Sequence, residues 1–100
     1  MDKKQPEDKS PEEKYEKLRK QLEQGFEWPQ VYMFKFIVPA QNKKIARVEN
    51  LFNSKEATIN MRASRKGNYV SITAKELMLS PERVIERYLE AEKIEGLISL

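Results

Sequence analysis

The sequence predicts an α+β domain in which a four-stranded antiparallel sheet carries two helices on one face. Strand-like and helix-like segments follow one another in the order β-α-β-β-α-β. The first strand-like segment is apolar on both faces, as expected for a central strand. Two later strands are joined by a Gly-Asn pair, which is typical of a hairpin. A sheet with the first and third strands central, and the second and fourth at the edges, satisfies this order.

Composition limits the classes of function. The 100 residues predict one small domain, with 39% hydrophobic and 35% charged residues. Cysteine and histidine are both absent, which removes disulfides, thiolate nucleophiles, the commonest metal ligand and the usual general base. No apolar run approaches the roughly 20 residues of a membrane span. We therefore expect a cytoplasmic protein that is not an enzyme and has no catalytic, metal-binding or cofactor-binding residues.

An extension precedes the domain. Residues 1–9 are mostly charged, and we expect them to be a disordered tail. Residues 10–30 read as a helix and a linker, because Ser10 can cap a helix whose first turn contains Pro11 and Glu13. This helix should end near Gly25, and its only apolar positions form one thin stripe of Tyr15, Leu18 and Leu22. Such a helix needs a surface to lie on.

The domain itself spans residues 31–100 and opens with a strand. Residues 31–38 are rich in β-branched and aromatic side chains, and Pro39 ends the strand because it lacks a ladder donor. If Tyr32, Phe34, Phe36 and Val38 face the helices, the odd-numbered Val31, Met33 and Ile37 face the open side. The first helix then covers residues 42–52, with a stripe of Ile45, Val48, Leu51 and Phe52.

A hairpin follows. Residues 56–65 alternate as a half-exposed strand does, with Ala57, Ile59, Met61 and Ala63 on one face and Thr58, Asn60, Arg62 and Ser64 on the other. Residues 69–75 alternate in the same way, with Val70, Ile72 and Ala74 inside. Gly67 and Asn68 between the strands supply the positive φ angles of a tight turn.

The second helix begins at Ser80-Pro81-Glu82, and a last short strand covers residues 97–100 after Gly96. The buried stripe of the helix is Val84, Ile85, Tyr88, Leu89 and Ile94. Its glutamates at 82, 86 and 90 form a solvent-facing row in which Arg83 and Arg87 supply local pairing. That row is an exposed face and meets none of the geometric requirements of a catalytic site.

The outward-facing rows of the sheet form the candidate binding face. Its polar and cationic members are Lys35, Asn60, Arg62, Tyr69, Ser71, Thr73 and Lys75. Residues 31–75 carry nine basic and two acidic groups, whereas residues 76–100 carry three basic and six acidic ones. The basic half of this polarised chain suits a small anion, a carboxylate or an acidic partner.

Three segments of the chain resemble the YbeD-like family of small bacterial proteins, a family of unknown function. They are Phe26-Glu-Trp-Pro-Gln-Val-Tyr-Met-Phe-Lys-Phe-Ile-Val-Pro39, Ser64-Arg-Lys-Gly-Asn-Tyr-Val-Ser-Ile-Thr73 and residues 88–100. The resemblance covers residues 26–100 and implies a ferredoxin-like βαββαβ fold comparable to ACT regulatory domains. It implies a regulatory or ligand-sensing role without catalytic residues. ACT domains bind amino acids at a glycine-containing turn after the first strand, whereas residues 39–43 contain no glycine.

RNA binding is an alternative interpretation. RNA-recognition motifs share this fold and stack bases on aromatic side chains of the two central strands. The segment Lys66-Gly67-Asn68-Tyr69 is similar to their basic-glycine-aromatic pattern, but it is one residue short and leaves only Tyr69 to stack.

A protein-interaction role is the other alternative. The apolar Val31, Met33 and Ile37 on the open side invite burial. In the intramolecular version of this interpretation, the helix over residues 10–24 covers them as a lid. Otherwise a protein partner or a second copy of the sheet would do so, which leaves monomer and homodimer both open.

Overall fold

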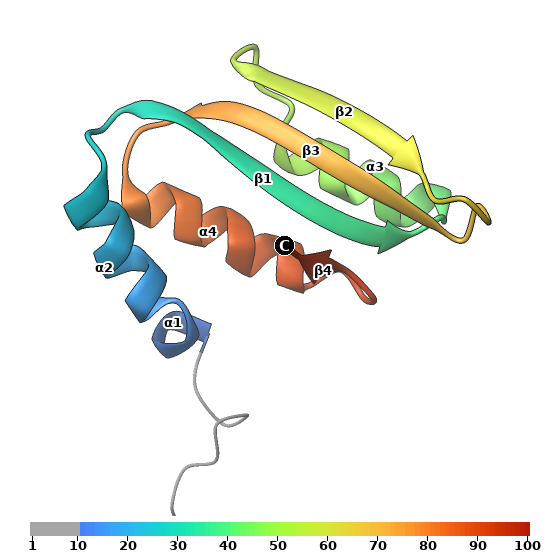
Figure 1. Ribbon diagram of the computed structural model, residues 1–100, viewed down its shortest axis with the longest axis horizontal. Helices are drawn as coiled ribbons and strands as arrows, with labels where there is room; N and C mark the ends of the chain where they lie inside the picture. The colour runs from blue at the N-terminus through green and yellow to red at the C-terminus, as the bar shows by residue number, and fades with distance from the viewer. Residues whose placement is uncertain (1–10) are drawn as a thin grey trace, which may run out of the picture.

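The computed structural model, which describes residues 11–100, is a four-stranded antiparallel sheet with helices packed against one face (Figure 1). The elements are α1 (Pro11–Lys14), α2 (Glu16–Gly25), β1 (Gln30–Pro39), α3 (Asn42–Leu51), β2 (Ala57–Ala63), β3 (Tyr69–Met78), α4 (Pro81–Glu92) and β4 (Ile98–Ser99). The strand order β2-β3-β1-β4 puts β1 and β3 in the centre, as predicted. The expected tail over residues 1–9 and the Ser10 cap lie outside the described residues.

The core lies between the sheet and the pair α3 and α4. Even-numbered side chains of β1 and β3 point into it because side chains alternate along a strand. Phe34 and Phe36 of β1 are fully buried, and so is Ile72 of β3. The Phe34 ring lies 5.2 Å from that of Tyr88 on α4 and 5.0 Å from that of Phe52 after α3, measured between centroids. Aromatic packing therefore joins both helices to the central strands.

The N-terminal helix differs from the prediction in shape and in position. It breaks at Tyr15 into α1 and α2, and α2 packs against α4 (Figure 1). The Tyr15 ring stacks on Tyr88 with centroids 5.5 Å apart, and Leu22 is buried in the core. The predicted lid over the open sheet face is therefore wrong, because the thin apolar stripe of this helix is used on the helical side of the sheet.

The hairpin forms as predicted, with one correction at its turn. Gly67 has a φ of 78°, whereas Asn68 does not have a positive φ. The turn is closed by the Gly67 amide, which donates to the Ser64 carbonyl at 2.9 Å, and by the Tyr69 amide, which donates to Ser64 Oγ at 3.1 Å. Beyond the hairpin, β3 continues to Met78, three residues further than the alternation up to Lys75 predicted.

The last strand is shorter than predicted. Gly96 has a φ of 85°, and a Cβ atom there would lie 2.8 Å from Cγ of Pro39. This glycine lets the chain turn closely against the end of β1. The following β4 pairs only its two residues with Phe36 and Ile37, and the Leu100 amide then donates to the Lys35 carbonyl at 2.9 Å.

Candidate functional site

All seven residues of the predicted binding face lie together on the sheet face that the helices leave open. The pairing register places Asn60, Thr73 and Lys35 in one row across β2, β3 and β1. Arg62 and Ser71 form the next row with Ile37, Lys75 lies opposite Met33, and Tyr69 lies opposite Pro39. Directly opposed residues point to the same side of a sheet, so the register alone brings this set together.

An apolar strip runs through the same face. It consists of Val31, Met33, Ile37, Leu77 and Ile98. Val31 pairs with Leu77 and Ile37 pairs with Ile98, so the strip crosses from β3 through β1 to β4. Four of its members are between 41% and 61% exposed, although each is a large apolar side chain. The alternation of β1 predicted the first three members, while Leu77 and Ile98 follow from the longer β3 and from the pairing of β4.

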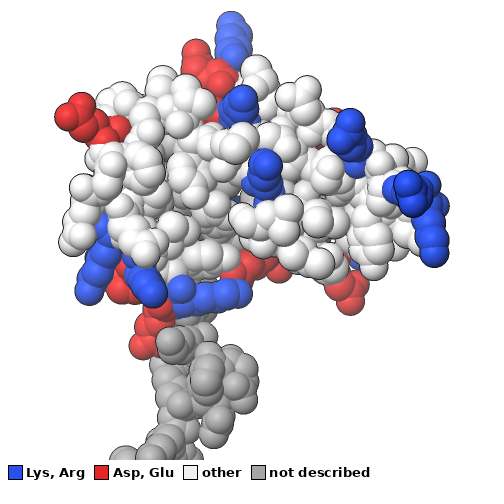
Figure 2. Space-filling view, viewed as in Figure 1, with Lys and Arg blue, Asp and Glu red and all other residues white. Residues whose placement is uncertain are grey.

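The charge on this face is of one sign. No Asp or Glu occupies an outward position of β1, β2 or β3. Within residues 11–100, the side chains of Lys35, Arg62 and Lys75 form no ion pair. Figure 2, viewed in the direction of Figure 1, shows Lys and Arg scattered over a broad uncharged surface, with Asp and Glu mostly near its margins. An anionic group that approaches the face therefore meets cations that are not already paired with a carboxylate of the described chain.

A shallow hollow of about 320 Å³ lies on this face near the hairpin. Its lining residues are Ile37, Arg62, Ala63, Ser64, Tyr69 and Ser71. The Arg62 guanidinium can donate to a carboxylate or phosphate, and Ser71 Oγ already donates to the Arg62 carbonyl at 3.4 Å. The hollow therefore offers a ligand apolar contacts, and beside them one guanidinium group and several hydroxyl groups.

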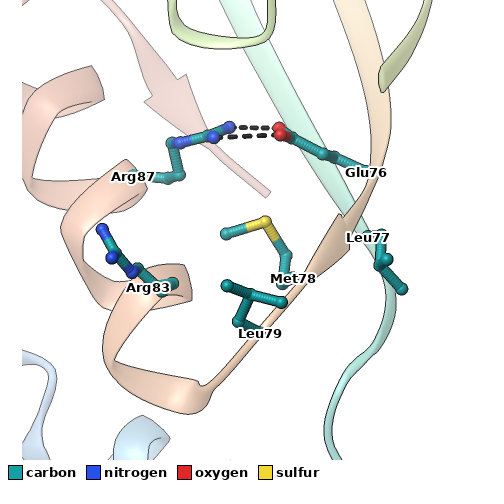
Figure 3. Close-up of a pocket in the computed structure, with 6 residues that line it drawn as sticks. All are labelled: Glu76, Leu77, Met78, Leu79, Arg83 and Arg87. Atoms are coloured by element: carbon teal, nitrogen blue, oxygen red, sulfur yellow. Dashed lines mark hydrogen bonds and ion pairs between the residues drawn. The ribbon is translucent and has the colours of Figure 1, made fainter. Parts of the chain in front are cut away.

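The sequence did not predict the ion pair beneath the face, in which buried Glu76 meets the partly exposed Arg87. Glu76 is 5% exposed, and its carboxylate accepts hydrogen bonds from the Arg87 guanidinium on α4 (Figure 3). It also accepts one from Ser54 Oγ at 2.8 Å. Arg87 was expected to pair along its own helix, and this expectation is wrong. A signal existed, because Glu76 continues the inward row of Ile72 and Ala74.

The environment of Glu76 shifts its pKa. Burial raises the pKa of this carboxyl, but the hydrogen bonds from Arg87 and Ser54 and the charge of Arg87 outweigh it, so the net shift is downward. A cavity of about 180 Å³ lies beside the pair (Figure 3), and its lining residues are Glu76, Leu77, Met78, Leu79, Arg83 and Arg87. The charge of Arg87 is already neutralised by Glu76, so we assign this site to holding β3 against α4.

Metal-binding clusters and membrane-spanning helices are both absent from residues 11–100. Over residues 11–100, no cluster of three or more His, Cys, Asp or Glu side chains is placed to hold a metal ion. Within the same residues, no helix has the length and apolar character needed to cross a membrane.

Comparison with known proteins yields one match. The model of a family described as "Protein of unknown function (DUF493)" matches residues 23–99, which cover the end of α2 and the whole sheet. No curated protein matches the chain, and no solved structure does so.

Proposed function

The chain belongs to the DUF493 family, the YbeD-like family that its sequence resembles, and we propose that it is a non-catalytic, regulatory binding module. Its binding surface is the open face of the sheet. The observation that carries this proposal is the combination of the apolar strip with three cations that form no ion pair within residues 11–100. Exposed apolar side chains that lie together and are rimmed by polar residues often mark an interaction site.

The family match supports the proposal only in general terms, because its description names no activity. The strand order supports our assignment of the domain to the ferredoxin-like class. Binding of an amino acid in the ACT manner receives no support, since the loop from Ala40 to Gln41 between β1 and α3 contains no glycine. The proposal therefore concerns the sheet face and leaves that loop aside.

The experiment is affinity capture with the full chain from an extract of its own cells. The open-face variant carries Lys35→Glu and Lys75→Glu, and the matched control carries Lys43→Glu and Arg47→Glu on the exposed side of α3. Both double variants change the net charge equally. We expect the wild type and the control to retain the same bound component, and we expect the open-face variant to lose it. Equal retention by all three proteins would contradict a role for the sheet face.

Nuclease treatment distinguishes RNA binding from binding of a protein or a small molecule. A protein or small-molecule partner survives nuclease, whereas an RNA ligand is released. RNA binding would need bases to stack on aromatic side chains, and Tyr69 is the only aromatic residue at an outward strand position. Loss of all bound material after nuclease treatment would therefore support an RNA-binding function in place of the proposed regulatory one.

A further inference from the structure

We propose that the open sheet face binds an acidic amphipathic helix of a protein partner, which lies along β1. This inference rests on the proposed function and names the class of partner. A sheet with one bare apolar face commonly completes its packing with a layer of helix. The strip on β1 provides such a face, and the cations beside it provide the preference for acidic residues.

The dimensions of the apolar strip suit a helix of ordinary length. Val31 and Ile37 are six residues apart on β1, which corresponds to about 20 Å along a strand. A helix of about 13 residues has this length, so three to four turns would cover the strip. Leu77 widens the strip on the β3 side, and Ile98 widens it on the β4 side. A helix with apolar residues at positions i, i+3, i+4 and i+7 presents a stripe of matching width.

The cations of the open face determine which residues should flank the apolar stripe of the partner helix. Lys35 lies within the strip, between Met33 and Ile37 on the same strand face. Lys75 and Arg62 lie on the side of the strip that is nearer β2. Glutamates or aspartates along one edge of the partner helix would therefore meet three cations that form no ion pair in the described chain.

A second copy of the chain fits this surface less well. Face-to-face packing of two identical sheets would place Lys35, Arg62 and Lys75 of one copy against a face that carries the same three cations. The face carries no outward carboxylate to offset that repulsion. Like charges across an interface disfavour association. The same strip also disfavours RNA, because aliphatic and methionine side chains give bases no ring to stack on.

The N-terminal helix of this chain, which could have covered the open face, packs elsewhere. Leu22 of α2 is buried in the core, and Tyr15 stacks on Tyr88 of α4. The two helices that make these contacts, α2 and α4, pack against each other on the helical side of the sheet (Figure 1). Among residues 11–100, no helix is therefore left to cover the open face.

Two synthetic helical peptides of about 14 residues test the inference. The acidic peptide carries Leu at i, i+3, i+4, i+7 and i+11 with Glu elsewhere on its flanks, and the basic peptide carries Lys in place of Glu. Each is titrated into the isotope-labelled full chain, and amide chemical shifts report both affinity and location. We expect the acidic peptide to bind at least about tenfold more tightly, with weakening at high salt, and to shift β1 and β3.

Variants locate the effect on the proposed surface. Lys35→Glu with Lys75→Glu should weaken the acidic peptide by about tenfold or more, whereas Lys43→Glu with Arg47→Glu should change its affinity by less than about twofold. Met33→Ala should weaken both peptides, because it removes apolar contact area from the strip without changing its charge. Each variant is first checked for an unchanged unfolding transition, so that a loss of binding is not a loss of fold.

Two outcomes overturn the inference and leave the proposed function intact. One is equal affinity for the two peptides, including absence of binding by both. The other is tighter binding of a single-stranded RNA oligonucleotide that shifts the same face. Peptide-induced shifts confined to α3 and α4 would overturn the inference and the proposed function together.

Discussion

The carboxylate of Glu76 on β3 is buried against the guanidinium of Arg87 on α4, with Oε2 and Nη2 3.1 Å apart. The Arg87 guanidinium also lies over the Phe52 ring, 5.0 Å from its centroid. Lys75 and Leu77, the two neighbours of Glu76, point to the opposite side and belong to the candidate binding face. One stretch of β3 thus carries a buried ion pair inward and the proposed binding surface outward, so the pair helps to hold that surface in place.

Replacing Arg87 should destabilise the fold strongly. Arg87→Met keeps an apolar stem but leaves the buried Glu76 carboxylate without its cation, and we expect a loss of about 3 kcal/mol in the free energy of unfolding. Arg83 lies one turn earlier on α4 and pairs with Glu86 at the surface, so Arg83→Met should cost less than about 0.5 kcal/mol. Urea denaturation of both variants checks the difference. Similar losses in the two variants would contradict a special role for Arg87.

Acid should weaken the fold partly through Glu76. Folding lowers the pKa of the Glu76 carboxyl below its unfolded value of 4.5. Its contribution to stability is therefore present above pH 4.5 and is lost as the pH falls through the folded pKa. We expect the wild type to lose its advantage over Glu76→Gln as the pH falls below the unfolded value of 4.5. Urea midpoints measured across this range test the sign. A difference between the two proteins that does not change with pH would refute the assignment.

The packing of α2 on the helical side predicts a large cavity effect. Leu22 is 3% exposed, so Leu22→Ala should lower the free energy of unfolding by about 2–4 kcal/mol. Its exposed neighbour Gln21 is the control, and Gln21→Ala should change that free energy by less than about 0.5 kcal/mol. Chemical denaturation measures both variants. If Leu22→Ala were as mild as the control, α2 would not be part of the core.

Two glycines with positive φ should respond differently to alanine. A Cβ atom added at Gly67 would meet nothing within 4 Å, so Gly67→Ala should cost about 1 kcal/mol from backbone strain alone. Gly96→Ala adds a Cβ atom 2.8 Å from Cγ of Pro39, and we expect a loss of about 2–3 kcal/mol. Thermal unfolding of the two variants gives the comparison. Equal losses would show that the contact with Pro39 relaxes without cost.

The candidate binding face was largely predictable because it depends on local periodicity. The alternation of Val70, Ile72 and Ala74 identifies their outward neighbours Tyr69, Ser71 and Thr73 before any pairing is known. The hairpin turn at Gly67 then aligns these residues with those of β2. The extension of the apolar strip to Ile98 was less accessible, since the placement of β4 beside Ile37 depends on a contact between distant parts of the chain.

The sequence by itself therefore determined the order of the elements, the central position of β1 and β3, and the side chains on each face. These properties follow from periods of two and 3.6 residues, which a short segment expresses alone. Only the tertiary structure decided that Tyr15 stacks on Tyr88, that Arg87 pairs with Glu76, and that no described helix covers the open face. A thin apolar stripe or a single charge fits several surfaces, and the choice among them depends on which surfaces the completed core leaves available.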